Sequence, residues 1–354
     1  MNPFMKYYQE EKEMMEKMIY EYNQSLLTEE NSYLRDNLKV FVNLNHSGKR
    51  IRGILVNLGY QLKKGRSTYS YPLALAYELF QTSILIHDDI IDQDEKRRGI
   101  ATVHYYNKEK YKEVSSETEV NHLSNSIALC IGDYGFYLAN QKIAEAYQED
   151  KNLGKVLTFF NDTVLKTAKG ELLDVILPFE SKNIGVELST LEKTIIDIYR
   201  LKTSYYTMIG PISSGMILAG TNKEELDSID KIGEKIGIAF QIQDDILGIF
   251  SNETGKTKAS DIKECKQTLL YAYAKNSSYS EELDSVYGTS KLDDTIIQKV
   301  QDIMKKSKAL EKATNLMNSL YDEAIHDIYQ LDWISEEDKD ILVGFVDYLR
   351  GRNQ

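Results

Sequence analysis

The sequence predicts an all-α protein, and three features carry this prediction. Apolar residues recur at intervals of three and four through most of the 354 residues, as at Ile297, Val300 and Ile303, which is typical of helices with one buried face. Alternating runs typical of half-buried strands are scarce. Only 4 Pro and 20 Gly are present, fewer turn residues than sandwiches and barrels need. Because no Pro-, Gly- or Ser-rich linker divides the chain, we expect one helical domain over residues 1–354.

The expected helices follow one another along the chain. Residues 1–30 mix acidic, basic and apolar side chains without the apolar run of a signal peptide, and they predict an amphipathic helix packed on the domain. Further helices are expected near residues 50–64, 70–93, 121–148, 152–178, 188–219 with an interruption near Pro211, 222–250, 261–275 and, in pieces, 294–350. The main loops are expected at residues 63–70, 93–99, 251–260 and 276–295.

Composition narrows the classes of partner. With 43 Lys and Arg against 55 Asp and Glu, the formal net charge of −12 disfavours nucleic acid and anionic lipid surfaces. No apolar stretch reaches the roughly 18 residues that a transmembrane helix needs. Cys130 and Cys265 show neither a disulfide framework nor the spacing of a metal site, which fits a reducing cytoplasm.

Residues 85–99, LIHDDIIDQDEKRRG, bring acidic and basic side chains together. Asp88 and Asp92 are four residues apart, so they lie one turn apart on one face of a helix. A charged surface turn is the simplest interpretation, but these acids end an apolar helix and are followed by Arg97 and Arg98. Such a set suits a magnesium-bridged phosphate, because carboxylate oxygens bind the metal and guanidinium groups bind the anion.

A second acidic pair, Asp244 and Asp245, ends another apolar helix in AFQIQDDILGIF, residues 239–250. One such pair is a weak signal, and chance recurrence is the alternative. Two apolar helices that both end in acids suggest a cavity with an acid-lined mouth, as in metal sites built within helical bundles. We therefore expect the two acidic segments to share one site.

Three segments carry basic residues that suit an anionic ligand. HSGKRIRG, residues 46–53, lies at an expected helix start, where free N–H groups and the helix dipole favour anions. The other two are YRLKTSYY, residues 199–206, and GKTKASDIKECK, residues 255–266. Each lysine taken alone is equally well explained as a surface side chain. Lys202 is the exception, because it lies within an apolar helix.

Together these segments resemble the trans-isoprenyl diphosphate synthases, the family that makes farnesyl, geranylgeranyl and longer polyprenyl diphosphates. The similarity runs in order from Gly48 to about Arg350 and comprises GKRIR at 48–52, the acidic motif with RRG at 88–99, ATVH at 101–104, GDY at 132–134, GELLD at 170–174, KT at 202–203, the second acidic region at 240–245, GK at 255–256 and the segment 261–266. The resemblance implies an isoprenoid synthase-type helical bundle around a central cavity and a homodimer. It also implies Mg²⁺-dependent head-to-tail condensation of isopentenyl diphosphate with an allylic diphosphate.

The resemblance also implies roles for individual residues. Three Mg²⁺ ions would be bound by Asp88, Asp92 and Asp244, with Asp89 and Asp245 in support. The allylic diphosphate would contact Arg97, Lys202 and Lys256. Isopentenyl diphosphate would contact Lys49, Arg52, Gln81 and Arg98, with Lys266 near the phosphates. The reacting carbons would be flanked by Thr203 and Gln241.

The chain departs from the family pattern at a few positions. Gly248 stands where many members carry a third aspartate, Glu171 where glutamine is usual and Cys265 where glycine is usual. None of these changes removes one of the expected metal ligands Asp88, Asp92 and Asp244. Activity is therefore still expected.

Product length is predicted from the helix that precedes the first acidic motif. Ile84, Ser83 and Phe80 lie four, five and eight residues before Asp88, so Phe80 is about 12 Å down the helix at 1.5 Å per residue. Small Ser83 would leave a tunnel open and Phe80 would close it, which predicts a C20 to C25 product. The alternative is that Phe80 faces another helix.

Two other functions remain open from the sequence. A class I terpene cyclase shares the acidic motif, but Leu165 stands where the second cyclase metal motif beginning at Asn161 and Asp162 needs Ser or Thr. A non-catalytic subunit of a heteromeric synthase would typically lose its aspartates, which this chain keeps. A cyclase would also leave the GKRIR and RRG segments unexplained.

Overall fold

In the computed structural model, residues 2–250, 260–289 and 292–352 are described, and their regular elements are helices apart from one short hairpin. The prediction of an all-α fold is confirmed. The chain forms two compact units. The N-terminal unit comprises residues 7–157 and 214–220, and the C-terminal unit comprises residues 1–6, 158–213 and 221–354.

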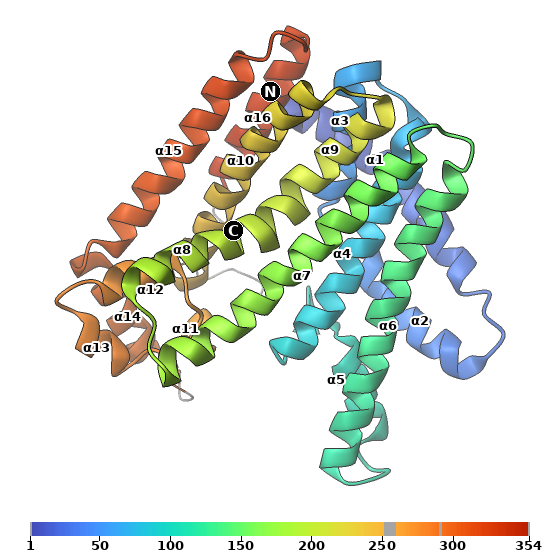
Figure 1. Ribbon diagram of the computed structural model, residues 1–354. Helices are drawn as coiled ribbons and strands as arrows, with labels where there is room; N and C mark the ends of the chain where they lie inside the picture. Colours follow the sequence, from blue (N-terminus) through green and yellow to red (C-terminus); the bar gives the residue numbers. More distant parts are fainter. Residues whose placement is uncertain (1, 251–259, 290–291, 353–354) are drawn as a thin grey trace. The chain divides into compact units, whose positions relative to one another are not determined.

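Helices α4 and α6 form the centre of the N-terminal unit, where they pack along each other (Figure 1), with α3 against α4 and α5 against α6. Both are largely apolar, and α4 is buried along most of its length. The elements that lie wholly or mostly in this unit are α1 (Pro3–Leu26), α2 (Ser32–His46), α3 (Ile51–Lys64), η1 (Thr68–Ser70), α4 (Tyr71–Ile91), β1 (Lys96–Arg97), β2 (Ile100–Ala101), α5 (Val103–Tyr111) and α6 (Glu117–Ala146).

Helix α10 forms the centre of the C-terminal unit, where it packs along η2 and α15. Three helices, α1, α7 and α9, have residues in both units. The remaining elements of the chain are α7 (Leu153–Asn183), α8 (Leu188–Ile198), η2 (Tyr199–Ile209), α9 (Gly210–Ala219), α10 (Lys223–Phe250), α11 (Ser260–Lys263), α12 (Leu269–Lys275), α13 (Ser280–Asp284), α14 (Asp294–Lys306), α15 (Ala309–Tyr329) and α16 (Glu336–Arg350).

Side-chain caps explain several helix starts. Ser116 and Glu119 form a capping box at α6, in which each side chain bonds the other residue's backbone N–H. Asn31 caps α2 by accepting the N–H groups of Tyr33 and Leu34. Helix α2 is not among the helices expected from the sequence. Its capping residue Asn31 and the helical spacing of Leu38 and Phe41 are nevertheless features that predict a helix start and a buried face.

The expected interruption near Pro211 is wrong. The chain stays helical from Leu188 to Ala219, and the irregular part is the π-helix η2, which precedes the proline. Pro211 is the second residue of α9, directly after the π-helix, and it does not break the helix. Within the described part of the chain, no helix combines the length and apolar character needed to cross a membrane.

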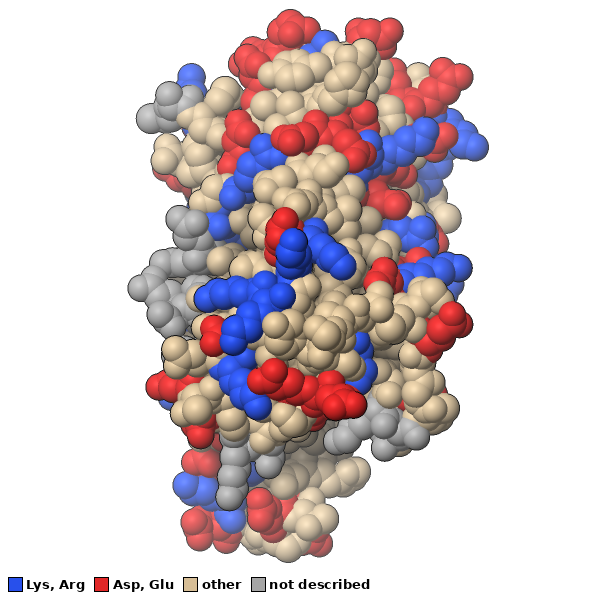
Figure 2. All heavy atoms as spheres, turned by 90° about the vertical axis from the view of Figure 1, so that its left-hand side faces the viewer, with Lys and Arg blue, Asp and Glu red and all other residues tan. Residues whose placement is uncertain are grey.

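The surface carries charges of both signs. Figure 2 shows Lys and Arg side chains interspersed with Asp and Glu on the face that it draws.

Candidate active site

Arg50 of the GKRIR segment has a structural role. It adopts a left-handed conformation with φ of 57° directly before α3, and it is 3% exposed. Its Nε and Nη2 donate to the two carboxylate oxygens of Glu16 at 2.9 and 3.1 Å, and Glu78 lies 3.5 Å from its Nη1. A buried guanidinium needs such partners. The pairing therefore fixes the segment from which Lys49 and Arg52 project.

The basic residues expected at the isopentenyl diphosphate site gather around this segment. Arg98 donates from Nη1 to the carbonyl oxygen of Ser47, so the hairpin arginine lies against GKRIR. Burial lowers the pKa of Arg98, and the neighbouring positive charges of Arg52 and Arg97 lower it further. Mutually repelling guanidinium groups are stabilised by an anion between them. Lys49 is exposed nearby, at the position before Arg50.

The first acidic motif is held by an arginine from the hairpin. Arg97 donates from Nε to Asp89 Oδ1 and from Nη2 to Asp88 Oδ2, the latter at 3.0 Å. Burial raises the pKa of Asp89 to about 7, although Arg97 opposes this shift. Asp89 is fully buried, and its Oδ2 has no hydrogen-bond partner among the described residues. Asp88 and Asp92 are less buried than Asp89.

The residues proposed to set product length lie on α4. Phe80 is fully buried, and its ring centroid is 5.5 Å from that of Phe136 on α6. Ser83 is also buried and donates to the carbonyl oxygen of Leu79 at 2.8 Å. Ile84 is half-buried and Gln81 is buried. Phe80 therefore contacts another helix, as the alternative interpretation held, and its role in product length stays a prediction.

In the C-terminal unit, Lys202 lies in the π-helix η2 between two carboxylates. Its Nζ is 2.8 Å from Glu171 Oε2 and 2.6 Å from Asp174 Oδ2, both on α7. Gly170 of α7 allows this approach, because a Cβ on Gly170 would lie 2.4 Å from the backbone N of Lys202. The cluster of one lysine and two acids carries a formal charge of −1.

A chain of hydrogen bonds links the KT segment to the second acidic motif. Thr203 Oγ1 donates to Gln241 Oε1 at 2.6 Å, and Gln241 Nε2 donates to Asp245 Oδ1 at 2.9 Å. Asp245 Oδ2 accepts from the hydroxyl of Tyr199. Burial raises the pKa of Asp245 to about 7, while Lys266 lowers it and Asp261 raises it. The structure thus brings Thr203, Gln241 and Asp245 together.

The two aspartates of the second motif have different environments. Asp245 is 2% exposed and both its oxygens accept hydrogen bonds, whereas the side chain of Asp244 is 38% exposed. Asp244 Oδ1 accepts from Arg352 Nη2 at 3.1 Å, and the guanidinium of Arg352 lies 4.5 Å from the ring centroid of Phe240. Asp244 is therefore the more accessible of the two carboxylates.

Asp261 lies beside the position at which a third aspartate is missing. A Cβ on Gly248 would be 2.7 Å from Asp261 Oδ2, so the glycine leaves room for this buried carboxylate. Lys266 accepts from the Tyr287 hydroxyl through its backbone oxygen, at 2.9 Å. Lys256 and the segment 251–259 lie outside the described residues.

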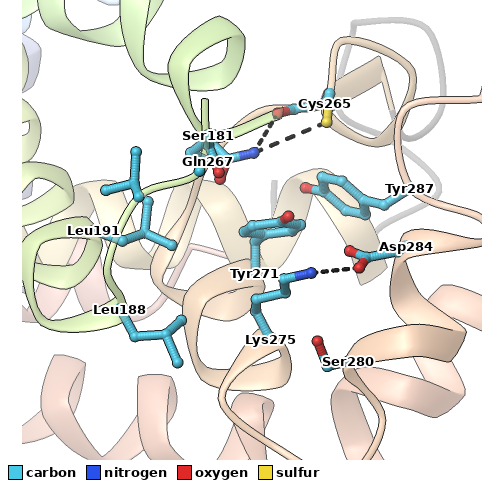
Figure 3. Close-up of a pocket in the computed structure, with 12 residues that line it drawn as sticks. Ser181, Leu188, Leu191, Cys265, Gln267, Tyr271, Lys275, Ser280, Asp284 and Tyr287 are labelled. Atoms are coloured by element: carbon cyan, nitrogen blue, oxygen red, sulfur yellow. Dashed lines mark hydrogen bonds and ion pairs between the residues drawn. The ribbon is translucent and has the colours of Figure 1, made fainter. Parts of the chain in front are cut away.

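A cavity of about 470 Å³ lies in the C-terminal unit between α8, α12 and the end of α7 (Figure 3). Its wall combines apolar Leu188 and Leu191 with the ion pair of Lys275 and Asp284. Cys265 also lines it, with φ of 57°. This left-handed conformation explains why glycine is usual at the position. Among the described residues, none to which a role is assigned lines this cavity.

The acidic motifs suit Mg²⁺ by their donor chemistry. Mg²⁺ prefers carboxylate oxygens, and it is commonly held by one or two carboxylates together with waters and substrate phosphates. The described residues contain no group of three or more His, Cys, Asp or Glu side chains arranged to hold an ion. They do contain the buried, unsatisfied Oδ2 of Asp89 and the accessible carboxylate of Asp244. These features fit an ion that shares its coordination with substrate.

Two residues of these networks, Tyr199 and Arg352, are not among the site residues predicted from the sequence. Tyr199 precedes Lys202 by three positions, and nothing in the sequence distinguishes it from the other aromatic and apolar residues of its segment. Arg352 follows the last helix and bonds Asp244. Its positive charge, two residues after Arg350, is the one feature of the sequence that could have suggested an acidic partner. Neither residue lies in a motif whose spacing predicts a partner.

Comparison with known proteins gives a consistent result. The family model described as polyprenyl synthetase matches residues 34–304. The geranylgeranyl diphosphate synthase of Sulfolobus acidocaldarius is 29% identical over 292 residues, covering 80% of this chain and 81% of that protein. The geranylfarnesyl diphosphate synthase of Aeropyrum pernix is 26% identical over 306 residues, covering 85% and 89%.

A solved structure has the same fold. The geranylgeranyl pyrophosphate synthase from Corynebacterium glutamicum, crystallised with isoprenyl diphosphate and magnesium, superposes with a TM-score of 0.87 at 23% identity. The alignment covers 96% of this chain and 98% of that one. Since the family match covers most of the chain as well, the chain belongs to the polyprenyl synthetase family of trans-prenyltransferases.

Proposed function

We propose that this enzyme condenses isopentenyl diphosphate with an allylic diphosphate and releases a trans-polyprenyl diphosphate of C20 to C25. The observation that carries the proposal is the hydrogen-bond chain from Thr203 through Gln241 to Asp245, beside Lys202. Lys202 supplies a cation for the diphosphate, and Thr203 and Gln241 supply oxygen dipoles for the reacting carbons. The hydrogen bonds connect these oxygens to Asp245 of the second acidic motif. The geranylgeranyl and geranylfarnesyl diphosphate synthases among its relatives support the product range.

Each acidic motif has a role in binding metal ions. Asp88, Asp92 and Asp244 would hold Mg²⁺, three ions in all, and Asp89 and Asp245 would orient them from buried positions. When bound, Mg²⁺ neutralises the diphosphate and stabilises it as a leaving group. The ion pair of Arg97 with Asp88 and Asp89 supports this assignment, since it shows that cationic charge is accommodated there.

Basic residues bind the two substrates. Lys49, Arg52, Gln81 and Arg98 would hold isopentenyl diphosphate, with Lys266 near the phosphates. Arg97, Lys202 and Lys256 would hold the allylic diphosphate. Cleavage of the allylic carbon–oxygen bond leaves a carbocation on the substrate, which the oxygen dipoles of Thr203 and Gln241 stabilise. The double bond of isopentenyl diphosphate attacks this carbon, and the proton lost goes to the departing diphosphate.

Product analysis tests the proposed function. The purified protein is incubated with Mg²⁺, isopentenyl diphosphate and dimethylallyl, geranyl or farnesyl diphosphate in turn, and the dephosphorylated products are separated by chromatography. Linear C20 to C25 alcohols are expected. Cyclic hydrocarbons from the allylic substrate alone would indicate a terpene cyclase instead. No turnover by the protein on its own would indicate a subunit of a heteromeric synthase.

Replacing Phe80 should lengthen the product. Phe80→Ala removes a fully buried ring, at a cost of about 3–5 kcal/mol in stability, so the milder Phe80→Leu is measured beside it. Both variants are expected to shift the product distribution upward by at least one isoprene unit. Phe160→Leu, at another fully buried phenylalanine, is the control and should leave product length unchanged. An unchanged length in both Phe80 variants would remove Phe80 as the stop.

Glu171→Gln should tighten binding of the allylic diphosphate. The substitution removes one negative charge 2.8 Å from Lys202 Nζ, so the lysine attracts the diphosphate more strongly. We expect KM for the allylic substrate to fall by about threefold to tenfold, with KM for isopentenyl diphosphate unchanged. The same substitution at the exposed Glu149 is the control. A higher KM for the allylic substrate would contradict the role of Lys202.

We also place the enzyme in the cytoplasm as a homodimer. Helix α7 exposes Leu165, Leu172 and Phe179, which are 61%, 59% and 67% exposed. Their spacing of seven residues puts them on one face of α7, as expected for a surface that packs against a second helix. Free cysteines, as at Cys130 and Cys265, are compatible with a reducing compartment.

Charge on this face of α7 should prevent dimer formation. Leu172→Glu places a carboxylate in the apolar stripe, and we expect light scattering to show the wild type as a dimer and the variant as a monomer. Lys155→Glu, on an exposed part of the same helix, should remain dimeric. A wild-type monomer, or a dimer of Leu172→Glu, would exclude this face as the interface.

A further inference from the structure

Tyr199 is a buried residue without an assigned part in prenyl transfer. It is the first residue of η2 and is 3% exposed. Its hydroxyl accepts the N–H of Leu269 at 2.9 Å and donates to Asp245 Oδ2. Leu269 is the first residue of α12, where N–H groups lack partners within the helix. Since Leu269 donates to the hydroxyl oxygen, the proton of Tyr199 is directed at Asp245.

The orientation of Asp245 determines that of Gln241. A carboxylate only accepts hydrogen bonds, so its Oδ1 draws the NH₂ end of the Gln241 amide, at 2.9 Å. The amide oxygen then faces Thr203 and accepts its hydroxyl at 2.6 Å. A flipped amide would bring Oε1 against the Asp245 carboxylate, which is unfavourable. One tyrosine hydroxyl thus determines the direction of three successive hydrogen bonds.

We propose that Tyr199 is a positioning residue for prenyl transfer, which it serves by holding Asp245 and, through it, Gln241 and Thr203. The inference rests on the proposed function, because it requires that the oxygens of Gln241 and Thr203 face the reacting carbons. Oxygen dipoles that are already oriented stabilise a developing cation without the cost of reorganisation. Loss of the Tyr199 hydroxyl frees the carboxylate to rotate, and the amide loses its fixed direction.

The experiment uses Tyr199→Phe, which keeps the buried ring and removes only the hydroxyl. We expect kcat to fall about tenfold, as for loss of one hydrogen bond to a charged group. KM for isopentenyl diphosphate should stay unchanged, because the Tyr199 hydroxyl bonds Asp245 and Leu269, neither of which is assigned to that substrate. Thermal unfolding by circular dichroism shows whether each variant is folded.

Tyr147→Phe is the matched control. The Tyr147 hydroxyl also accepts a backbone N–H in the first turn of a helix, that of Leu73 at 3.2 Å in α4. It donates to the carbonyl oxygen of Tyr69 at 2.7 Å. Both hydroxyls are buried and cap a helix, but Tyr147 has no link to a residue assigned to the reaction. Tyr147→Phe should lower the melting temperature to a similar extent and leave kcat unchanged.

A double-mutant cycle tests whether Tyr199 acts through Gln241. Gln241→Met removes the amide, so adding Tyr199→Phe to it should lower kcat no further. Additive losses, an unchanged kcat in Tyr199→Phe, or an equal loss in Tyr147→Phe would overturn the inference. If Tyr199→Phe does not fold, Leu269→Pro takes its place in the cycle with the same expected non-additivity, because it removes the N–H that orients the Tyr199 hydroxyl at a helix position that tolerates proline. Absence of prenyl transfer by the wild type would overturn the proposed function and this inference together, whereas wild-type transfer with unaffected variants overturns the inference alone.

Discussion

Asp88→Ala is expected to lower kcat by about 100- to 1,000-fold, the usual cost of losing a group that stabilises transition-state charge. The substitution removes a proposed metal ligand at a partly exposed helix end, so the fold should survive. Arg97 retains Asp89 and Asp94 as partners. Steady-state kinetics over a range of Mg²⁺ concentrations should also show a higher Mg²⁺ requirement.

Asp133→Ala is the control for Asp88→Ala. Asp133 is an exposed aspartate on α6 whose neighbour is His87, and no role in binding is assigned to it. Its replacement should leave kcat within about twofold of the wild type, as is usual for surface substitutions. Equal kinetics of the Asp88 and Asp133 variants would contradict a catalytic role for the first acidic motif.

Gly170→Ala is expected to destabilise the protein by about 1–3 kcal/mol and to weaken binding of the allylic diphosphate. The added Cβ would lie 2.4 Å from the backbone N of Lys202 and 2.9 Å from the carbonyl carbon of Leu201. Backbone atoms cannot give way as a flexible side chain can, so η2 has to move from α7. This movement would disrupt the ion pairs of Lys202 with Glu171 and Asp174. Denaturant unfolding and KM for the allylic substrate measure the two effects.

Gly154→Ala on the same helix is the matched control. No described atom lies within 4 Å of a Cβ at this position. Alanine has the higher helix propensity, so stability should stay constant or rise by up to about 1 kcal/mol. If Gly154→Ala and Gly170→Ala unfold at the same denaturant concentration, close packing of α7 against η2 is not the reason for Gly170.

The acidic pairs could be found from the sequence because helix ends have local signals. Asp88 and Asp244 each follow an apolar helical run, and the structure places both near the ends of helices. The turn of the hairpin that brings Arg97 back to Asp88 is also marked in the sequence, by the glycine at position 99. Its turn residues Arg98 and Gly99 have φ of 53° and 79°, a conformation that glycine favours.

The π-helix and the networks around it could not be found in this way. The register of η2 depends on contacts with distant helices, such as that of Gly170 with Lys202. No periodicity within the segment YRLKTSYYTMI distinguishes a π-helix from an α-helix. The hydrogen bond of Tyr199 to Asp245 likewise joins residues far apart in sequence, which only the folded chain brings together.

Asp261 limits which side chains this chain can carry at position 248. Because the Asp261 carboxylate already occupies the space beside Gly248, an aspartate introduced at 248 would not simply restore the missing third acid. The two carboxylates would repel each other, and Asp261 would have to leave its buried place. We therefore expect a single Gly248→Asp exchange to impair this enzyme.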